Sequence, residues 1–536
     1  MKIFTFDTTL RDGTQGESVS FSVDDKMVIA QKLDELGIDY IEGGWPGSNP
    51  KDKEFFERAK ELKLHHAKLT AFGATRFAKN PVEEDRNVAA LLAANTPVIS
   101  VFGKSWELHT RRALGITEEE NLKLISDTVK FLKDHGKEVV YDAEHFFDGY
   151  QASAAFALRT LEAAQKAGAD VLVLCDTNGG TLTGKLSEIV SEVRKRFDGV
   201  LGIHTHNDSD VAVANTLAAV EQGCTHVQGC MNGYGERCGN ANLASIIANL
   251  ELKLGHTTVG PEKLTSLSTV ARFIAELANL PLRGDQPFVG HSAFAHKGGV
   301  HVSAVLKDNS TYEHIAPESI GNRQRVLVSD LSGRSNVLYK LKQHGLADRL
   351  SEESRRELLE RIKEMEYLGY ELEAAEGTFE LLVREALYPG VHFFDVEGYE
   401  VTTKSTGAVG SRSTATVNLR AQDGVHSATA SGQGPVHALD LCLRKCLSSL
   451  YPSISEVRLT DYKVRVLEPK KGTAARVRVL VEWSDHRKSW STVGVSDNVI
   501  EASWSALVDA IRLELMRVTE QDESVERAVE DYCWGV

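Results

Sequence analysis

Several residue types and patterns are scarce in this chain of 536 residues. Its seven cysteines are scattered without the paired spacing of a metal site, and so odd and sparse a set argues against a disulfide framework and for a reducing compartment. No apolar run reaches the roughly 20 residues of a membrane-spanning helix. Residues 1–7 are typical of a strand rather than of a signal peptide, so we expect a cytoplasmic protein.

An excess of positive charge is also missing. Lysine and arginine number 61 against 76 aspartate and glutamate residues, which leaves a net charge of −15. Proteins that bind nucleic acid or anionic membrane surfaces are basic, so we expect neither partner. Hydrophobic residues make up 42% and charged residues 26% of the chain, as in an ordinary soluble globular protein. An anionic substrate therefore needs a locally positive pocket.

The first half of the chain repeats one pattern, in which a short apolar run is followed by a polar turn and an amphipathic stretch of helical period. Eight apolar runs are the expected strands: Lys2–Phe6, Ile38–Gly43, Lys68–Gly73, Pro97–Gly103, Glu138–Glu144, Asp170–Asp176, Leu201–His206 and Thr225–Met231. Eight strands that alternate with helices predict an α/β fold, the (β/α)8 or TIM barrel. A doubly wound open sheet is the alternative, but the first strand lacks a following Gly-x-Gly-x-x-Gly turn.

Polar clusters follow the predicted strands at the end where such a barrel carries its functional groups. They occur at six of the eight strand ends, over Asp7–Gln15, Glu42–Asn49, Asp142–His145, Asp176–Gly179, His204–Asp208 and Asn232–Asn240. A polar cluster at one strand end is commonplace. The same placement at six ends predicts an active site at this end of the barrel.

After the barrel the sequence pattern changes twice, first to a helical region and then to a region rich in predicted strands. We expect a catalytic barrel over residues 1–256, helical linker subdomains that contribute to the active site over 257–390, and a regulatory domain over 391–536. In the middle region His291, His296 and His301 accompany a Gly-Gly bend, which indicates an arm that reaches towards a site. Ordinary polar loop residues are the alternative.

The third region is an α+β domain that passes twice through the order strand, strand, strand, helix. The first pass is expected over Tyr399–Ser405, Ser413–Arg420, Val425–Ser431 and the helix Val436–Leu450, and the second over Val457–Leu467, Ala475–Trp483, Lys488–Val495 and the helix Ile500–Arg517. A duplicated βββα unit without a catalytic-looking cluster is typical of a regulatory or oligomerising domain.

His204 and His206 are separated by one residue on a predicted strand, so their side chains share a face. Two imidazoles at a strand end suit a divalent cation that still needs oxygen ligands, although a His-x-His pair can equally be two core histidines. Asp12 offers a carboxylate and Asn240 a carbonyl oxygen, and the mixed set suits Mg²⁺, Mn²⁺ or Zn²⁺. Such a metal binds a 2-keto acid through two oxygens and makes its keto carbon electrophilic.

Other polar residues fit the same chemistry. Arg11 supplies a cation where an enolate or alkoxide oxygen develops charge. Glu144 and Thr177 reach the same mouth of the barrel and can orient the substrate. His301 of the arm can act as a base or an acid near neutral pH. The predicted reaction is carbon–carbon bond formation or cleavage at a keto acid, without a redox cofactor.

Three motifs resemble the isopropylmalate and homocitrate synthase family: Leu10-Arg-Asp-Gly-Thr-Gln15 with Lys26 beyond it, His204-Thr-His-Asn-Asp208, and Gly235-Glu-Arg-Cys-Gly-Asn240. The wider family contains hydroxymethylglutaryl-CoA lyase, and the resemblance implies a metal-dependent TIM barrel. The C-terminal half resembles the allosteric dimerisation domain of these synthases at Gly432–Leu439 and Thr492–Asn498. The resemblance therefore covers nearly the whole chain.

The resemblance also implies roles for individual residues. It implies a metal held by Asp12, His204, His206 and Asn240. It implies that Arg11 stabilises the enolate, that Glu144 orients the substrate and that Thr177 lies in the active site. The acid–base residues of the arm fall on His301 and Tyr312.

Within the family, Glu42–Asp52 and Tyr141–Phe147 look like the long-form citramalate synthases. The resemblance implies condensation of acetyl-CoA, as co-substrate, with pyruvate to give CoA and (R)-citramalate, and this reaction is the entry to isoleucine synthesis from pyruvate. The resemblance further implies a homodimer and feedback control by isoleucine at the C-terminal domain. Keto-acid choice then depends on the pocket walls, for which Trp45, Phe72, Phe102 and Asp142 are candidates, although each can equally be packing.

Three alternatives are weighed at this point, one of them a lyase that runs the reverse reaction, although lyases of this type lack so long a regulatory extension. A 2-isopropylmalate or homocitrate synthase uses 2-ketoisovalerate or 2-ketoglutarate, and the second acid needs an extra cation, for which Arg76 or Lys104 can serve. A protein of a different class, a catalytically idle amino-acid sensor, would keep the barrel as a scaffold only. The intact Arg11, Asp12 and Glu144 argue against it, because an idle barrel has no physical need for a buried charged cluster.

Overall fold

The computed structural model describes residues 1–327, 336, 339–341, 349–406, 410–421, 424–484 and 489–533, with the backbone alone over 520–533. The chain divides into two compact units, Met1–Phe294 with Glu313–Gln324, and Ala295–Tyr312 with Arg325–Val536. The domain boundaries predicted at residues 256 and 390 stay a prediction. Within the described ranges, no helix is long and apolar enough to cross a membrane.

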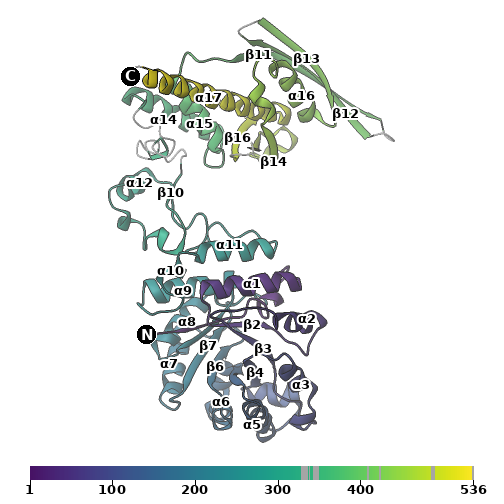
Figure 1. Ribbon diagram of the computed structural model, residues 1–536, viewed down its shortest axis with the longest axis vertical. Coiled ribbons are helices and arrows are strands. Elements are labelled where there is room, and N and C mark those ends of the chain that lie inside the picture. The colour runs from purple at the N-terminus through teal and green to yellow at the C-terminus, as the bar shows by residue number, and fades with distance from the viewer. Residues whose placement is uncertain are drawn as a thin grey trace. The chain divides into compact units, whose positions relative to one another are not determined.

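Eight parallel strands close the first unit into a barrel, and they follow one another around it in chain order (Figure 1). They are β1 (Phe4–Asp7), β2 (Tyr40–Gly44), β3 (Lys68–Ala74), β4 (Val98–Lys104), β5 (Glu138–Glu144), β6 (Val171–Asp176), β7 (Val200–Thr205) and β8 (His226–Gly229). The barrel closes where Phe4 of β1 pairs with His226 of β8. The predicted TIM barrel is confirmed, with a strand at each of the eight predicted positions.

Helices follow the strands and cover the outside of the barrel. They are α1 (Val23–Leu36), α2 (Pro50–Ala59), α3 (Arg86–Ala93), α4 (Glu107–His109), α5 (Glu118–Asp134), α6 (Phe146–Ala167), α7 (Thr183–Arg194), α8 (Ala212–Glu221), α9 (Leu243–Leu252), α10 (Pro261–Leu264) and α11 (Leu267–Leu277). Local sequence sets several of their ends. Ser22 and Thr117 each form a capping box that begins a helix, and Gly168 ends α6 in the left-handed conformation.

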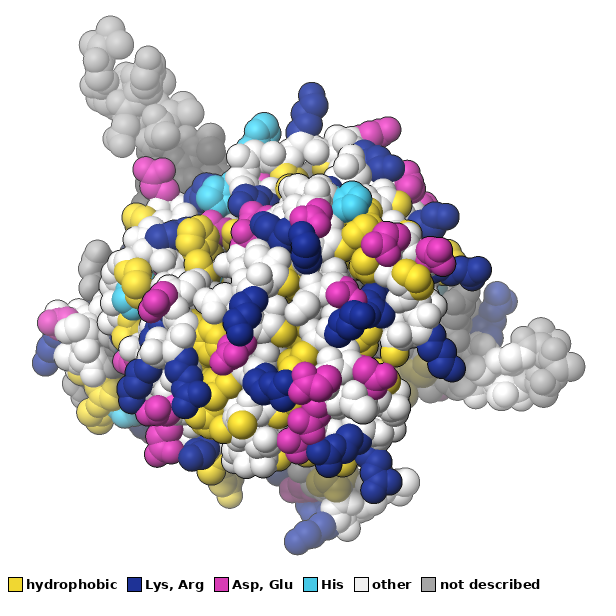
Figure 2. All heavy atoms as spheres, turned by 90° about the horizontal axis from the view of Figure 1, so that it is seen from below, with side chains coloured by type: hydrophobic (Ala, Val, Ile, Leu, Met, Phe, Trp, Pro, Cys, Tyr) yellow, Lys and Arg dark blue, Asp and Glu magenta, His cyan; other side chains and the backbone are white. Residues whose placement is uncertain are grey.

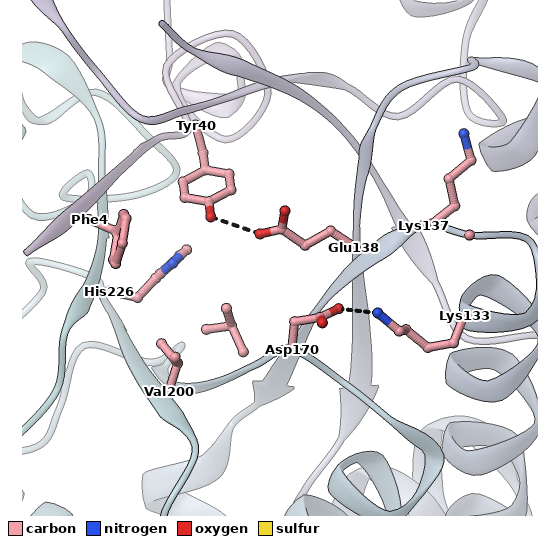
Figure 3. A pocket seen from close by; sticks show the side chains of 10 residues that line it. Phe4, Tyr40, Lys133, Lys137, Glu138, Asp170, Val200 and His226 are labelled. Atoms are coloured by element: carbon pink, nitrogen blue, oxygen red, sulfur yellow. Dashed lines mark hydrogen bonds and ion pairs between the residues drawn. The ribbon is translucent and has the colours of Figure 1, made fainter.

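Strand-initial residues line a cavity of about 420 Å³ at the amino-terminal end of the barrel (Figure 3). Tyr40 Oη donates to Glu138 Oε1 at 2.7 Å, and Lys133 Nζ donates to Asp170 Oδ2 at 2.6 Å. His226 is buried against the rings of Phe6 and Tyr40, and burial lowers its pKa to about 3, so its imidazole is neutral. This end of a TIM barrel serves stability rather than catalysis.

The second unit contains two three-stranded antiparallel sheets, each with one long helix. Its elements are β9 (Ala295–His296), α12 (Gly299–Val305), β10 (Arg325–Val326), α14 (Glu352–Tyr367), α15 (Glu376–Leu387), β11 (Phe394–Thr406), β12 (Gly410–Ala421), β13 (Gly424–Gly432), α16 (Pro435–Leu447), β14 (Arg458–Val466), β15 (Val477–Ser484), β16 (Ser489–Ser496) and α17 (Val499–Cys533). The predicted duplication of a βββα unit is confirmed, and α17 continues beyond its predicted end at Arg517. Lys488, the predicted first residue of the last strand, lies outside the described residues.

Each βββα half contains the same close backbone contact between its last strand and its helix, which the sequence repeat alone does not reveal. Gly432 at the end of β13 and Gly494 in β16 both lie against the first turns of the helix that follows. A Cβ atom would lie 2.6 Å from the backbone nitrogen of Ala438 in the first half and 2.0 Å from the carbonyl oxygen of Ala502 in the second. Only glycine permits this approach at either position.

Helix α15 belongs to the core of this second unit although it precedes both sheets in the chain. Thr378 Oγ1 accepts from the backbone nitrogen of Val493 at 3.0 Å. Glu380 pairs with Arg517 of α17 at 2.5 Å, and Leu381 packs in the core beneath the sheets. The segment before residue 390 and the regulatory region after it are therefore packed as one body.

Candidate active site

The carboxyl-terminal ends of the strands surround a second cavity of about 270 Å³, and a cluster of possible metal ligands lies in its wall. Asp12, His204 and His206 are all buried and offer ligand atoms within 4.8 Å of one another. His204 Nε2 lies 3.2 Å from His206 Nε2 and 3.4 Å from Asp12 Oδ2. One carboxylate and two imidazoles at this spacing are the donor set of a divalent metal site.

Two buried oxygen atoms beside this cluster have no hydrogen-bond partner among the described residues. They are Asp12 Oδ1 and Asn240 Oδ1. Asn240 forms a β-bridge with His206, and its Nδ2 donates to the carbonyl oxygen of Tyr234, so its own carbonyl oxygen is left over. A buried oxygen atom without a hydrogen-bond donor costs free energy of folding, and a bound cation would provide a partner for both oxygen atoms. The residues present therefore fit a divalent metal ion.

The protonation states of Asp12 and His206 also favour metal binding. Burial raises the pKa of Asp12, but the charge of Arg11 and the hydrogen bond with His204 outweigh it and hold that pKa well below its usual range. Burial, together with the neighbouring His204, lowers the pKa of His206 to about 3. An ionised carboxylate and a neutral imidazole are the forms that bind a metal.

His204 is oriented by a chain of buried hydrogen bonds that crosses the barrel interior. Its Nδ1 donates to Gln228 Oε1 at 3.0 Å, and Gln228 Nε2 donates to Asp142 Oδ1 at 3.0 Å. Ser100 Oγ completes the chain by donating to Asp142 Oδ2 at 2.5 Å. If a metal ion took the place of the proton on His204 Nε2, the hydrogen bond to Gln228 would keep the remaining proton on Nδ1, the tautomer that a metal ligand requires.

Arg11 is held between the metal-ligand cluster and an aromatic ring. Its Nε donates to Glu42 Oε2 at 2.6 Å, its Nη1 lies 3.2 Å from Asp12 Oδ2, and its guanidinium lies 3.8 Å from the ring centroid of Phe72. Burial lowers the pKa of Arg11, but Glu42 and Asp12 more than compensate and keep it charged. Burial also raises the pKa of Glu42 to about 7 despite that partner. Arg11 therefore stays charged at the cavity wall, where its guanidinium is paired with Glu42 and Asp12.

Glu144 and Thr177 also line the cavity. Glu144 forms an ion pair with Lys104. Thr177 Oγ1 accepts from the backbone nitrogen of His145 at 2.9 Å, which leaves its hydroxyl hydrogen to donate elsewhere. Arg237 spans the neighbouring loops, because it pairs with Asp208 through two nitrogen atoms and donates to the carbonyl oxygen of Thr177.

The two cations proposed for a dicarboxylic keto acid are both engaged. Arg76 pairs with Asp127 at 2.6 Å and donates to the carbonyl oxygen of Asn80, beside a different cavity. Lys104 is the partner of Glu144. Neither arrangement supplies a free positive charge for a second carboxylate.

Six residues that the sequence singles out line the cavity: Arg11, Asp12, Glu144, Thr177, His204 and His206. Gln228 and Glu42 were not assigned roles, although a polar residue at an inward-facing strand position is a signal for both. His301 and Tyr312 lie in the second unit, where their rings stack with centroids 4.3 Å apart. Their predicted role at the barrel stays a prediction.

Surface charge on the face drawn in Figure 2 is mixed. Lysine and arginine side chains are interspersed with aspartate and glutamate side chains and with apolar ones, rather than gathered by sign. The guanidinium of Arg11, whose side chain is 13% exposed, lies at the cavity inside the barrel.

Three family models match successive parts of the chain. They are HMGL-like over residues 2–271, the homocitrate synthase post-HMGL domain-like model over 288–368, and the LeuA allosteric (dimerisation) domain over 373–514.

Curated proteins match the chain from end to end. It is 52% identical to the (R)-citramalate synthase of Aquifex aeolicus, over 97% of this chain and 99% of the relative, and 52% identical to that of Geobacter sulfurreducens, over 97% and 98%. Identity to the 2-isopropylmalate synthase of Clostridium kluyveri is 30%, over 95% of this chain and 96% of the relative. The chain belongs to the HMGL-like family and, within it, to the family of the (R)-citramalate synthases.

Proposed function

We propose that this protein condenses acetyl-CoA with pyruvate and water to give (R)-citramalate and CoA. A new bond joins the methyl carbon of the acetyl group to the keto carbon of pyruvate, and hydrolysis of the thioester releases CoA. The observation that carries the proposal is the 52% identity to (R)-citramalate synthases over 97% of the chain. The small cavity beside Arg11 and the buried ligand cluster supports it.

We assign the metal ligands to Asp12, His204, His206 and Asn240. A bound divalent cation supplies a Lewis acid that polarises the keto carbonyl group. Carboxylate, imidazole and carbonyl ligands are compatible with Mg²⁺, Mn²⁺ or Zn²⁺. Gln228 and Asp142 keep His204 in the required tautomer, as outer residues do around many metal sites.

The other residues have separate tasks. Arg11 faces the oxygen atom that becomes negatively charged and stabilises it from a fixed position. Thr177 donates its free hydroxyl hydrogen to the substrate. Glu144, which also lines the cavity, orients the substrate. We propose His301 and Tyr312 as the acid–base residues, because an imidazole and a phenol can exchange the protons of the acetyl methyl group and of the product hydroxyl group.

The proposed substrate is tested by CoA release from acetyl-CoA with one keto acid at a time. We expect turnover with pyruvate and at least about tenfold lower kcat/KM with 2-ketoisovalerate, since one extra methylene is discriminated by roughly 10- to 200-fold. With 2-ketoglutarate we expect less still, because Arg76 and Lys104 are already paired. A preference for 2-ketoisovalerate would move the protein to leucine synthesis with the same chemistry.

We further propose that the protein is a homodimer, that it works in the cytoplasm, and that isoleucine regulates it through the C-terminal domain. The match to the LeuA allosteric (dimerisation) domain over residues 373–514 supports dimer formation and control by a small molecule. A chain cut after residue 390 is a poor test of this control. The cut would remove Val493 and Arg517, which bind Thr378 and Glu380 of α15.

Control by isoleucine is better tested on the full-length protein. We expect CoA release to fall as isoleucine is added, and to fall much less with leucine, an isomer of equal size and charge. The shape of the side chain then decides binding, so leucine is the matched control. Equal responses to the two isomers, or no response to either, would contradict the proposed effector.

A further inference from the structure

One side of the candidate cavity is a wall of three aromatic rings. The Trp45 ring lies edge-to-face with Phe72 and Phe102, at centroid distances of 5.9 Å and 5.7 Å, and the latter two rings stack at 5.4 Å. Arg11 lies against Phe72 on this side. A keto acid whose reacting oxygen faces Arg11 therefore has this wall beside its side chain.

The indole of Trp45 is fixed from behind by a residue that does not line the cavity. Its Nε1 donates to Asn87 Oδ1 at 2.7 Å. Asn87 belongs to α3, is only 7% exposed, and donates through Nδ2 to the carbonyl oxygen of Ala74 at 2.7 Å. Because both ends of the amide are engaged, the side chain of Asn87 cannot turn without breaking one hydrogen bond.

The backbone of Trp45 is fixed as well. Its nitrogen donates to Asp52 Oδ2 at 2.9 Å, and Asp52 is itself paired with the buried Lys26 at 2.5 Å. Its carbonyl oxygen accepts from the backbone nitrogen and the hydroxyl group of Ser48. The ring can therefore move only by rotation of its side chain, and the hydrogen bond to Asn87 opposes that rotation.

We propose that Asn87 is a positioning residue that sets the upper size of the keto-acid side chain, by locking the Trp45 indole in the cavity wall. The inference rests on the proposed function. A locked ring cannot yield to added methyl groups, whereas an unlocked ring can rotate and enlarge the pocket, and closely packed surfaces discriminate sharply by size. Selectivity between keto acids of different size is thus controlled by a residue that does not line the cavity.

The test compares two full-length variants, one that removes the hydrogen bond between the Trp45 indole and residue 87 and one that keeps it. Asn87→Leu removes the acceptor for the indole, whereas Asn87→Asp keeps an acceptor oxygen for it and loses only the hydrogen bond to the carbonyl oxygen of Ala74. The measurement is the ratio of kcat/KM for pyruvate to kcat/KM for 2-ketoisovalerate. In Asn87→Leu we expect this ratio to fall about tenfold or more, chiefly through a lower KM for the larger acid. In Asn87→Asp we expect it to stay within about twofold of the wild-type ratio.

Asn215→Leu is the matched control. Asn215 is also a buried asparagine that donates to a loop carbonyl oxygen, that of Thr181, at 2.8 Å, but it does not touch Trp45. We expect this variant to lose stability and to keep the wild-type ratio. If Asn87→Leu does not fold, Trp45→Phe removes the indole N–H while keeping a ring, and we expect the ratio to fall there too.

The outcomes separate this inference from the proposed function. A wild-type enzyme that prefers a larger keto acid overturns the proposed function alone. An unchanged ratio in Asn87→Leu, or in Trp45→Phe where the first variant does not fold, overturns the lock whichever acid the wild type prefers. An equal fall in Asn215→Leu also overturns it, because the effect is then a general consequence of losing a buried asparagine.

Discussion

Chelation of divalent cations with EDTA is expected to abolish CoA release from acetyl-CoA and pyruvate, and added Mg²⁺, Mn²⁺ or Zn²⁺ to restore it. Asp12, His204 and His206 present their ligand atoms within 4.8 Å of one another, and the buried Oδ1 atoms of Asp12 and Asn240 have no partner among the described residues. Comparison of the three cations at equal concentration also identifies which one supports the fastest turnover.

Asp12→Asn should require at least about 100-fold more cation for half-maximal activity, since even outer-shell changes weaken metal sites by 10- to 100-fold. Asp7→Asn is the matched control, because Asp7 is an equally buried aspartate in β1 whose carboxylate is bound by Thr9 instead. Turnover that is insensitive to EDTA would mean that His204 and His206 are core histidines, the alternative that the sequence left open.

Arg11→Gln is expected to lower kcat by about 10² to 10³, the usual effect of removing one fixed donor from a developing negative charge. The same change leaves Glu42 buried without its ion-pair partner. Loss of one member of a buried pair costs about 3 to 5 kcal/mol of the free energy of unfolding. The variant should therefore be both slow and less stable to urea.

A second substitution separates these two effects. Arg11→Gln combined with Glu42→Gln removes both charges, so we expect most of the lost stability to return while kcat stays low. Recovery of kcat in the double variant would show that Arg11 acts only by balancing Glu42. Steady-state kinetics and urea denaturation of the same preparations make the comparison.

The sequence predicts the barrel and the cluster of Asp12, His204 and His206 because both depend on local patterns. Strand and helix periods alternate eight times, and His-x-His on a strand places two side chains on one face. The carboxyl ends of parallel strands meet at one end of a barrel, which brings Asp12 of the first strand end to His204 of the seventh.

Residues that act through others are less visible in the sequence. Gln228 and Asn87 lie far along the chain from the groups that they hold, His204 and the Trp45 indole, and neither belongs to a polar cluster at a strand end. The same limit applies to the ion pair of Lys104 with Glu144. Which partner a buried polar side chain meets is decided by tertiary packing, which sequence periodicity does not report.

The order of packing in the second unit has a consequence for synthesis on the ribosome. The barrel unit is complete once residue 324 has been made, whereas α15 finds its partners only when β16 and α17 follow, as far as Arg517. At roughly 5 to 20 residues per second, the 130 residues between the end of α15 at Leu387 and Arg517 take about 7 to 26 s. During this time the apolar face of α15 has no sheet to cover it, so the nascent chain is a natural client for a chaperone at this stage.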